Sequence, residues 1–331
     1  MAKTYEQIHA KQTLTKVKEE RMPFEWSINP YRGCAHGCSF CYARGFQGFI
    51  DKQANDEFQN HILLKMNAAE ALETQLSKLA VRYAHDLEAV RRHIGRVAIG
   101  TVTDPYQPVE SKTRITRECL KVLAKYRIRT SITTRSPLIL RDLDLLQAMD
   151  DILVNISIGS LDAKLIRLLE PGAPLPFKRL EALEALSGSG IRTGVFVAPI
   201  LPLLTDDKEG LEVLFAAARK GGADFVMTSL LRLSPDVKGW YYKTLCEHFP
   251  EKLQAYRDLY QGGAYTDESY RERIRRITDE LQLKYALTGD ETSKVKREAS
   301  STDSRGALLS KAAALEEIAG ELPVEQLSFG F

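Results

Sequence analysis

The sequence predicts an α/β fold: a partial (β/α)6 barrel of the TIM type with parallel strands, followed by a C-terminal helical extension and a flexible tail. Six short β-branched runs recur along the chain, each followed by helical periodicity. Several of these runs are almost continuously apolar, as expected for parallel strands that are covered on both faces. The units recur at intervals of about 20 to 40 residues. A complete barrel has eight units in about 250 residues, so six units predict an incomplete barrel.

The six predicted strands cover residues 26–31, 96–103, 129–134, 152–158, 193–199 and 224–230. Between the first two, Leu72, Leu76 and Leu79 form one apolar stripe, which predicts a long helix over 65–84. A further helix over 116–125 would bury Cys119 as a small apolar side chain.

The pattern divides the chain into four segments. A polar N-terminal arm, 1–25, is expected to lie against the body of the protein, and the barrel takes residues 26–233. A C-terminal helical extension follows over 234–288. The last segment, 289–331, begins with a stretch rich in Ser, Thr, Lys and Glu, which predicts a linker leading to a tail peptide.

Composition narrows the class of protein. The 46 Lys and Arg residues against 44 Asp and Glu give a net charge of only +2, so any nucleic-acid surface must be a local patch. No apolar run approaches the roughly 18 residues of a membrane span, and the N-terminus has no apolar signal-peptide core. We therefore expect a cytoplasmic protein with no membrane partner.

The cysteines point to a metal centre. Five cysteines, three of them within eight positions, do not resemble the framework of a secreted disulfide protein. Cys34, Cys38 and Cys41 lie in a loop after the first predicted strand, where barrel enzymes place their chemistry. Gly33 and Gly37 permit the turns that would direct three thiolates at one centre. Such a set predicts a 4Fe-4S cluster in which one iron has no protein ligand.

The three cysteines are also compatible with two simpler arrangements. A structural zinc site would need a fourth ligand, and neither Cys119 nor Cys246 has a partner nearby, although His36 could supply one nitrogen. The thiols could also be reduced and without a metal.

The C-x3-C-x2-C spacing, with Phe40 before the last cysteine and Tyr42 after it, resembles the signature of the radical S-adenosylmethionine superfamily. This resemblance implies that the open iron is chelated by the amino and carboxylate groups of S-adenosylmethionine. It implies reductive cleavage to methionine and a deoxyadenosyl radical, which abstracts a substrate hydrogen. It also implies a reducing electron donor such as flavodoxin or ferredoxin.

A narrower resemblance rests on four segments, 29–34, 100–108, 133–137 and 169–171, each at or beyond the carboxyl end of a predicted strand. Together they are similar to the spore photoproduct lyase-like branch, also described as DNA repair photolyase-like, over about 26–233. This similarity implies a lyase-like enzyme that acts on DNA or on a nucleotide-like substrate in repair.

The resemblance and the strand ends nominate residues for binding S-adenosylmethionine. Asp104 could pair with the ammonium group, with Thr103 beside it, although an Asp-Pro turn is the plain alternative. Ser157 could meet the ribose or the carboxylate, or act only as a cap. Tyr42 is included for its position directly after the triplet.

Three positively charged residues stand near the same strand ends. Thr134 and Arg135 end the third strand, and Arg135 could bind a carboxylate or phosphate, or form a surface ion pair. Arg32 and Arg44 bracket the cysteine loop and could stabilise a charged cluster or the S-adenosylmethionine carboxylate, or lie in solvent.

The chain departs from true spore photoproduct lyases at one position. Those enzymes use an additional cysteine as hydrogen donor, and Thr101 occupies that place here. This substitution argues against repair of the spore photoproduct itself. Two sets of arginines could meet phosphates or could be solvated helix faces; they are Arg91, Arg92, Arg96, and Arg271, Arg273, Arg275, Arg276.

The C-terminus suggests a partner. The segment from Gln326 to Phe331 resembles the short peptide that docks bacterial DNA repair proteins on the sliding clamp, and a flexible linker would let it reach that partner. The alternative is a tail that packs on its own barrel. Two other functions stay open: a radical enzyme acting on a small molecule or peptide, and a non-catalytic metal-binding adaptor.

Overall fold

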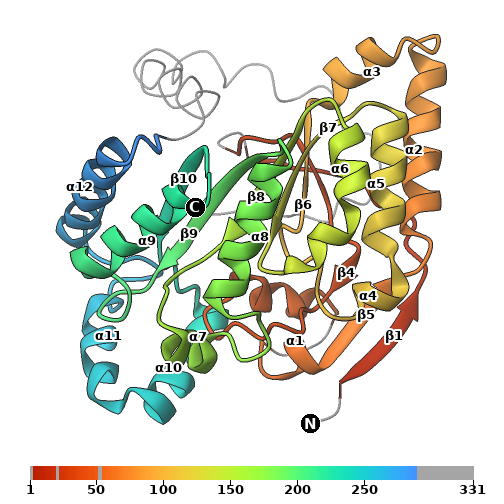
Figure 1. Ribbon diagram of the computed structural model, residues 1–331. Helices are drawn as coiled ribbons and strands as arrows, with labels where there is room; N and C mark the ends of the chain where they lie inside the picture. The colour runs from red at the N-terminus through yellow and green to blue at the C-terminus, as the bar shows by residue number, and fades with distance from the viewer. Residues whose placement is uncertain (1–2, 20–21, 51–53, 289–331) are drawn as a thin grey trace, which may run out of the picture.

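The computed structural model describes residues 3–19, 22–50 and 54–288 (Figure 1). Its main sheet has seven strands in the order β10-β9-β8-β7-β6-β3-β2. The six strands from β10 to β3 are parallel, and β2 (Thr15–Lys16) pairs antiparallel at the edge. The six predicted strands are therefore confirmed, as β3 (Trp26–Ile28), β6 (Arg96–Ile99), β7 (Arg129–Thr134), β8 (Ile152–Ser157), β9 (Arg192–Ile200) and β10 (Phe225–Leu230).

Helices lie along one face of this sheet (Figure 1). They are α2 (Ala68–Arg82), α3 (Leu87–Ile94), α5 (Ile115–Lys125), α6 (Leu143–Ala148), α8 (Pro176–Gly188) and α9 (Lys208–Lys220). Alternate strand residues such as Ile132, Val154 and Val195 form one buried cluster with the leucines of these helices. Because side chains alternate across a strand, the other face carries their neighbours, including Ser131 and Asn155. One face of the partial barrel is thus an apolar core, and the opposite face contains polar groups.

A second, three-stranded sheet was not predicted. It has the order β1-β5-β4, formed by β1 (Thr4–Ile8), β5 (His61–Lys65) and β4 (Tyr31–Arg32). The expected helix over 65–84 begins only at Ala68, because the residues before it pair as a strand with β1 and β4. Through β1 and β2, the N-terminal arm lies against the body of the protein.

The C-terminal extension contains α10 (Pro235–His248), η3 (Pro250–Lys252), α11 (Leu253–Leu259) and α12 (Glu268–Lys284). In α10, Val237, Tyr241 and Leu245 are buried in a cluster that also contains Cys38 and Phe40. Ile274 and Leu281 of α12 join the main core instead. The extension therefore forms part of the wall behind the cysteine loop.

The predicted linker and tail peptide, 289–331, lie outside the described residues. Among the helices that the structure describes, none is both long and apolar enough to cross a membrane.

Candidate active site

The cysteine loop lies at the carboxyl end of β3, between β4 and the 3-10 helix η1 (Tyr42–Ile50). Cys34 and Cys38 are buried, and Cys41 is partly exposed. Gly33 has a φ of +80°, and a side chain there would place its Cβ 2.8 Å from the carbonyl oxygen of His61. Only glycine therefore lets the loop turn this closely over β5.

Burial raises the pKa of all three thiols, that of Cys34 to about 12. The charges of neighbouring cysteines contribute in the same direction for Cys34 and Cys38, so the three sulfurs lie within electrostatic range of one another. The raised pKa values favour the protonated thiols. A bound metal would instead favour the deprotonated form, since metals bind the thiolate.

The three thiols are compatible with a four-iron cluster. Within the described part of the chain, no three His, Cys, Asp or Glu side chains are grouped so that they could hold one metal ion. A four-iron cluster offers a separate iron to each thiolate, so its ligands need not converge on one point. His36 is buried and its Nδ1 lies 3.2 Å from a carboxylate oxygen of Asp104, which leaves Nε2 as the nitrogen that a metal could bind.

Asp104 is buried and surrounded by donors. Its Oδ1 accepts hydrogen bonds from the hydroxyl of Thr134 at 2.6 Å and from the backbone N–H of Tyr106 at 2.9 Å. Its Oδ2 accepts from the backbone N–H of Arg135 at 2.8 Å. Burial alone would raise the pKa of Asp104, but His36 and these donors lower it to about 2. The turn expected as the alternative at Asp104 is present, and protein donors already engage both carboxylate oxygens. Pairing with the ammonium group of S-adenosylmethionine stays a prediction.

Thr103 holds the cysteine loop. Its hydroxyl donates to the carbonyl oxygen of Gly33 at 2.7 Å and accepts from the side chain of Gln107 at 3.2 Å. Gln107 in turn accepts from the backbone N–H of Ala35 at 3.0 Å. Gln107 lies in the 100–108 segment but was not among the predicted site residues. Its position three residues after Asp104 was the signal that could have identified it.

Arg135 lies within electrostatic range of Cys38 and Cys41 and belongs to a buried ion network. Its Nε lies 3.3 Å from a carboxylate oxygen of Glu170, which also pairs with Arg179. Burial alone would lower the pKa of Arg135, but Cys38 and Glu170 raise it. The ion pair expected as the alternative for Arg135 is therefore present, but it is largely buried and not at the surface. Glu170 lies in the Leu-Glu-Pro segment on which the narrower resemblance rests, and this could have identified it. Neither Glu170 nor Arg179 was predicted as a site residue.

Ser157 and Tyr42 differ in their exposure to solvent. Ser157, at the end of β8, is buried, and its backbone carbonyl accepts from Arg179 at 2.9 Å. Tyr42 is partly exposed, donates its hydroxyl proton to the carbonyl oxygen of Thr101 and packs edge-on against Phe46. The structure thus brings the triplet together with Asp104, Thr134 and Arg135 at the carboxyl ends of β3, β6 and β7.

Arg44 is fully buried beneath the loop rather than solvated. Its guanidinium donates to the carbonyl oxygens of Cys38 at 3.0 Å and Gly37 at 3.1 Å. Arg32 is only half-buried, in β4.

The two sets of arginines expected to meet phosphates are mostly paired with acids. Arg96 lies 2.8 Å from Asp151, and Arg273 lies 2.9 Å from Asp206. The other pairs are Arg91 with Glu88, Arg271 with Glu268, and Arg275 and Arg276 with Glu272. These pairs reduce the positive charge available to a phosphate backbone.

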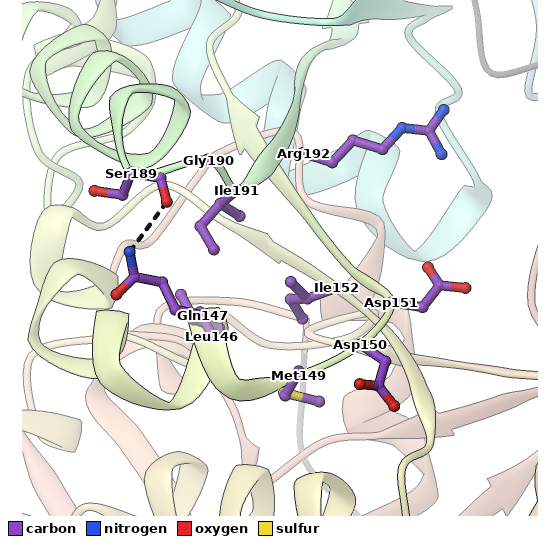
Figure 2. Close-up of a pocket in the computed structure, with 10 residues that line it drawn as sticks. All are labelled: Leu146, Gln147, Met149, Asp150, Asp151, Ile152, Ser189, Gly190, Ile191 and Arg192. Carbon is purple, nitrogen blue, oxygen red and sulfur yellow. Dashed lines mark hydrogen bonds between the residues drawn. The ribbon is translucent and has the colours of Figure 1, made fainter.

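A pocket of about 460 Å³ lies at the opposite end of the sheet (Figure 2). It is formed at the amino ends of β8 and β9, where Gln147 donates to the carbonyl oxygen of Ser189 at 3.1 Å. Two acids of its lining, Asp150 and Asp151, pair with arginines on neighbouring segments. Since barrel enzymes act at the carboxyl ends of their strands, this pocket is not part of the candidate site.

Known proteins share both the sequence and the fold. The chain is 33% identical over 293 residues to an uncharacterized protein of Mycobacterium tuberculosis, covering 87% of this chain and 82% of that protein. It is 32% identical over 245 residues to one of Methanocaldococcus jannaschii, covering 74% and 84%. A structure of spore photoproduct lyase complexed with dinucleoside spore photoproduct matches with a TM-score of 0.63 at 17% identity, covering 85% and 79%, which shows a common fold.

The sequence model of the radical SAM superfamily matches residues 28–214, more than half of the chain. This range includes the cysteine loop and all the nominated site residues. The chain therefore belongs to the radical S-adenosylmethionine superfamily of enzymes, which use a 4Fe-4S cluster and S-adenosylmethionine.

Proposed function

We propose that Cys34, Cys38 and Cys41 bind three irons of the 4Fe-4S cluster and leave the fourth open to S-adenosylmethionine. The observation that carries this proposal is the loop itself, which holds three neighbouring cysteines at the carboxyl end of β3. When bound, the reduced cluster supplies the electron that cleaves S-adenosylmethionine to methionine and a deoxyadenosyl radical.

The surrounding residues have separable roles. Arg135, whose guanidinium lies within electrostatic range of the cysteines, would bind the carboxylate of S-adenosylmethionine. Thr103, Asp104 and Thr134 would act by holding the loops that form the pocket, because their side chains are engaged by protein groups. Tyr42 and Ser157 would border the adenosine on the exposed and buried sides.

The test is anaerobic reconstitution with iron and sulfide, followed by reduction and addition of S-adenosylmethionine. Wild-type protein is expected to form deoxyadenosine, and Cys38→Ala to form none. Cys119→Ala is the matched control, since Cys119 is equally buried but lies in α5. If wild type assembles no cluster, or leaves S-adenosylmethionine intact, the non-catalytic metal-binding adaptor replaces the enzyme.

The substrate we propose is DNA or a nucleotide-like molecule, and the support is the fold shared with a lyase that was crystallised with a dinucleoside lesion. Thr101 carries no thiol, so the product hydrogen must come from another donor than a cysteine at this position. Deuterated dinucleotides would be incubated with the active enzyme, and transfer of deuterium into deoxyadenosine would identify the substrate class. Transfer only from a small molecule or peptide would favour the alternative.

The partners we propose are flavodoxin or ferredoxin as reductant and a sliding clamp that binds residues 326–331, in the cytoplasm. Calorimetry with a synthetic 324–331 peptide and a scrambled control tests the clamp. Equal heats for the two peptides would remove the clamp from this proposal.

A further inference from the structure

Arg44 carries a buried positive charge that no acid of the described residues neutralises. Its side chain is completely buried, and no carboxylate in the described part of the chain lies within salt-bridge distance. Besides the two carbonyls of the cysteine loop, it donates to the backbone oxygen of Asn55 at 2.6 Å and to the side-chain oxygen of Gln59 at 2.8 Å. All four acceptors are neutral groups. An unpaired buried charge is unfavourable, so a countercharge nearby would be stabilising.

Two aromatic rings fix the guanidinium in place. Its central carbon lies 5.0 Å from the centre of the Phe58 ring and 4.8 Å from that of Trp240. Phe58 belongs to α1 (Glu57–Asn60) and Trp240 to α10 of the extension. The guanidinium lies over both rings and is buried from solvent, so its field is weakly screened.

The ionisable groups that act most strongly on this charge are the three cysteines. Cys41, Cys38 and Cys34 each act electrostatically on Arg44, ahead of Asp56 in effect. The backbone oxygens of Gly37 and Cys38 connect Arg44 to the same loop. A cluster held by the three thiolates would therefore supply the countercharge that Arg44 lacks.

We infer that Arg44 is a positioning residue that sets the reduction potential of the cluster. A reduced cluster carries one more negative charge than the oxidised cluster, so a fixed cation beside it favours reduction and raises the midpoint potential. Arg135 is less suited to this role because Glu170 offsets its charge. This inference rests on the proposed binding of the cluster by the three cysteines.

The test is a redox titration of the reconstituted full-length protein, followed by electron paramagnetic resonance. Arg44→Met removes the charge, and Gln59→Glu places a carboxylate against the guanidinium and neutralises it in position. Both are expected to lower the midpoint potential by at least 59 mV, a tenfold fall in the ratio of reduced to oxidised cluster at fixed potential. Arg44→Lys keeps the charge and is expected to stay near wild type. Arg276→Met, on the exposed face of α12, is the matched control.

The outcomes separate the two proposals. If wild type assembles no cluster, the proposed function fails. If wild type assembles one and the loaded Arg44→Met and Gln59→Glu proteins titrate like it, the role of Arg44 is overturned. If Arg44→Met assembles no cluster, Gln59→Glu decides alone, because it retains the hydrogen-bonding side chain of Arg44.

Discussion

Asp104 joins three segments of the site through one carboxylate. It accepts hydrogen bonds from its own loop at Tyr106 and from the end of β7 at Thr134 and Arg135, and it lies beside His36 of the cysteine loop. A longer or shorter side chain could not reach all of these groups. The residue is therefore as important for the shape of the site as for any contact with S-adenosylmethionine.

Replacing Asp104 with Ala is expected to lower the free energy of unfolding of the metal-free protein by about 2 to 4 kcal/mol, because several buried donors lose their acceptor. Asp104→Asn keeps the shape but places an amide where Oδ2 accepts from Arg135, so a smaller loss is expected. Urea unfolding under reducing conditions measures both. Equal stability of wild type and the Ala variant would contradict this role.

At the scale of elements, a second buried network connects α5, η2 (Pro137–Asp142) and the start of α6. Asp142 is fully buried and accepts from Arg117 at 2.8 Å, from Arg141 at 2.8 Å and from the Tyr106 hydroxyl at 3.0 Å. Asp142→Ala is expected to cost about 1 to 3 kcal/mol of unfolding free energy, since Arg117, Arg141 and the Tyr106 hydroxyl lose a buried acceptor while Asp144 and Glu110 still pair with the two arginines. Asp144→Ala, on the exposed side of Arg117, should change stability far less in the same urea titration.

The exposed end of this network has its own pH dependence. Hydrogen bonds from Arg117 lower the pKa of Asp144 from 3.8 to about 2. Because the folded value is the lower one, this pair stabilises the fold above about pH 4 and ceases to do so as the pH falls through about 2. Carboxyl NMR should show Asp144 titrating near 2 in wild type and higher in Arg117→Met. A wild-type value near 3.8 would contradict the pairing.

The sequence was sufficient to predict elements wherever the pattern was long and strong. The six parallel strands followed from apolar runs, and the cysteine loop from its spacing. The strand β5 was missed because its five residues run directly into the helix that follows, so the two patterns merged. The sequence could not predict the environment of Arg44, since Phe58 and Trp240 come into contact with it only in the folded chain.

At the scale of the whole molecule, two parts of the chain far apart in sequence form one site. The barrel supplies the cysteine loop, and α10 of the extension covers it through Tyr241 and Trp240. Charge is balanced over the chain as a whole, because the net charge is +2 and most arginines of the two predicted phosphate-binding sets are paired with acids. An extended contact with a DNA backbone would therefore find few unpaired cations in these two sets.

This balance predicts a weak dependence of DNA binding on salt. The logarithm of the DNA-binding constant falls linearly with the logarithm of the salt concentration. Each phosphate that the protein neutralises contributes about −0.9 to this slope. For undamaged duplex DNA we expect a slope of about −2 or shallower, which corresponds to about two phosphates. Fluorescence anisotropy titrations between about 50 and 200 mM salt measure this slope. Arg92→Ala is the comparison variant, because Arg92 lies outside the observed ion pairs. A slope steeper than about −4 would show that an extended phosphate surface forms on binding, and the substrate would then be sought in duplex DNA.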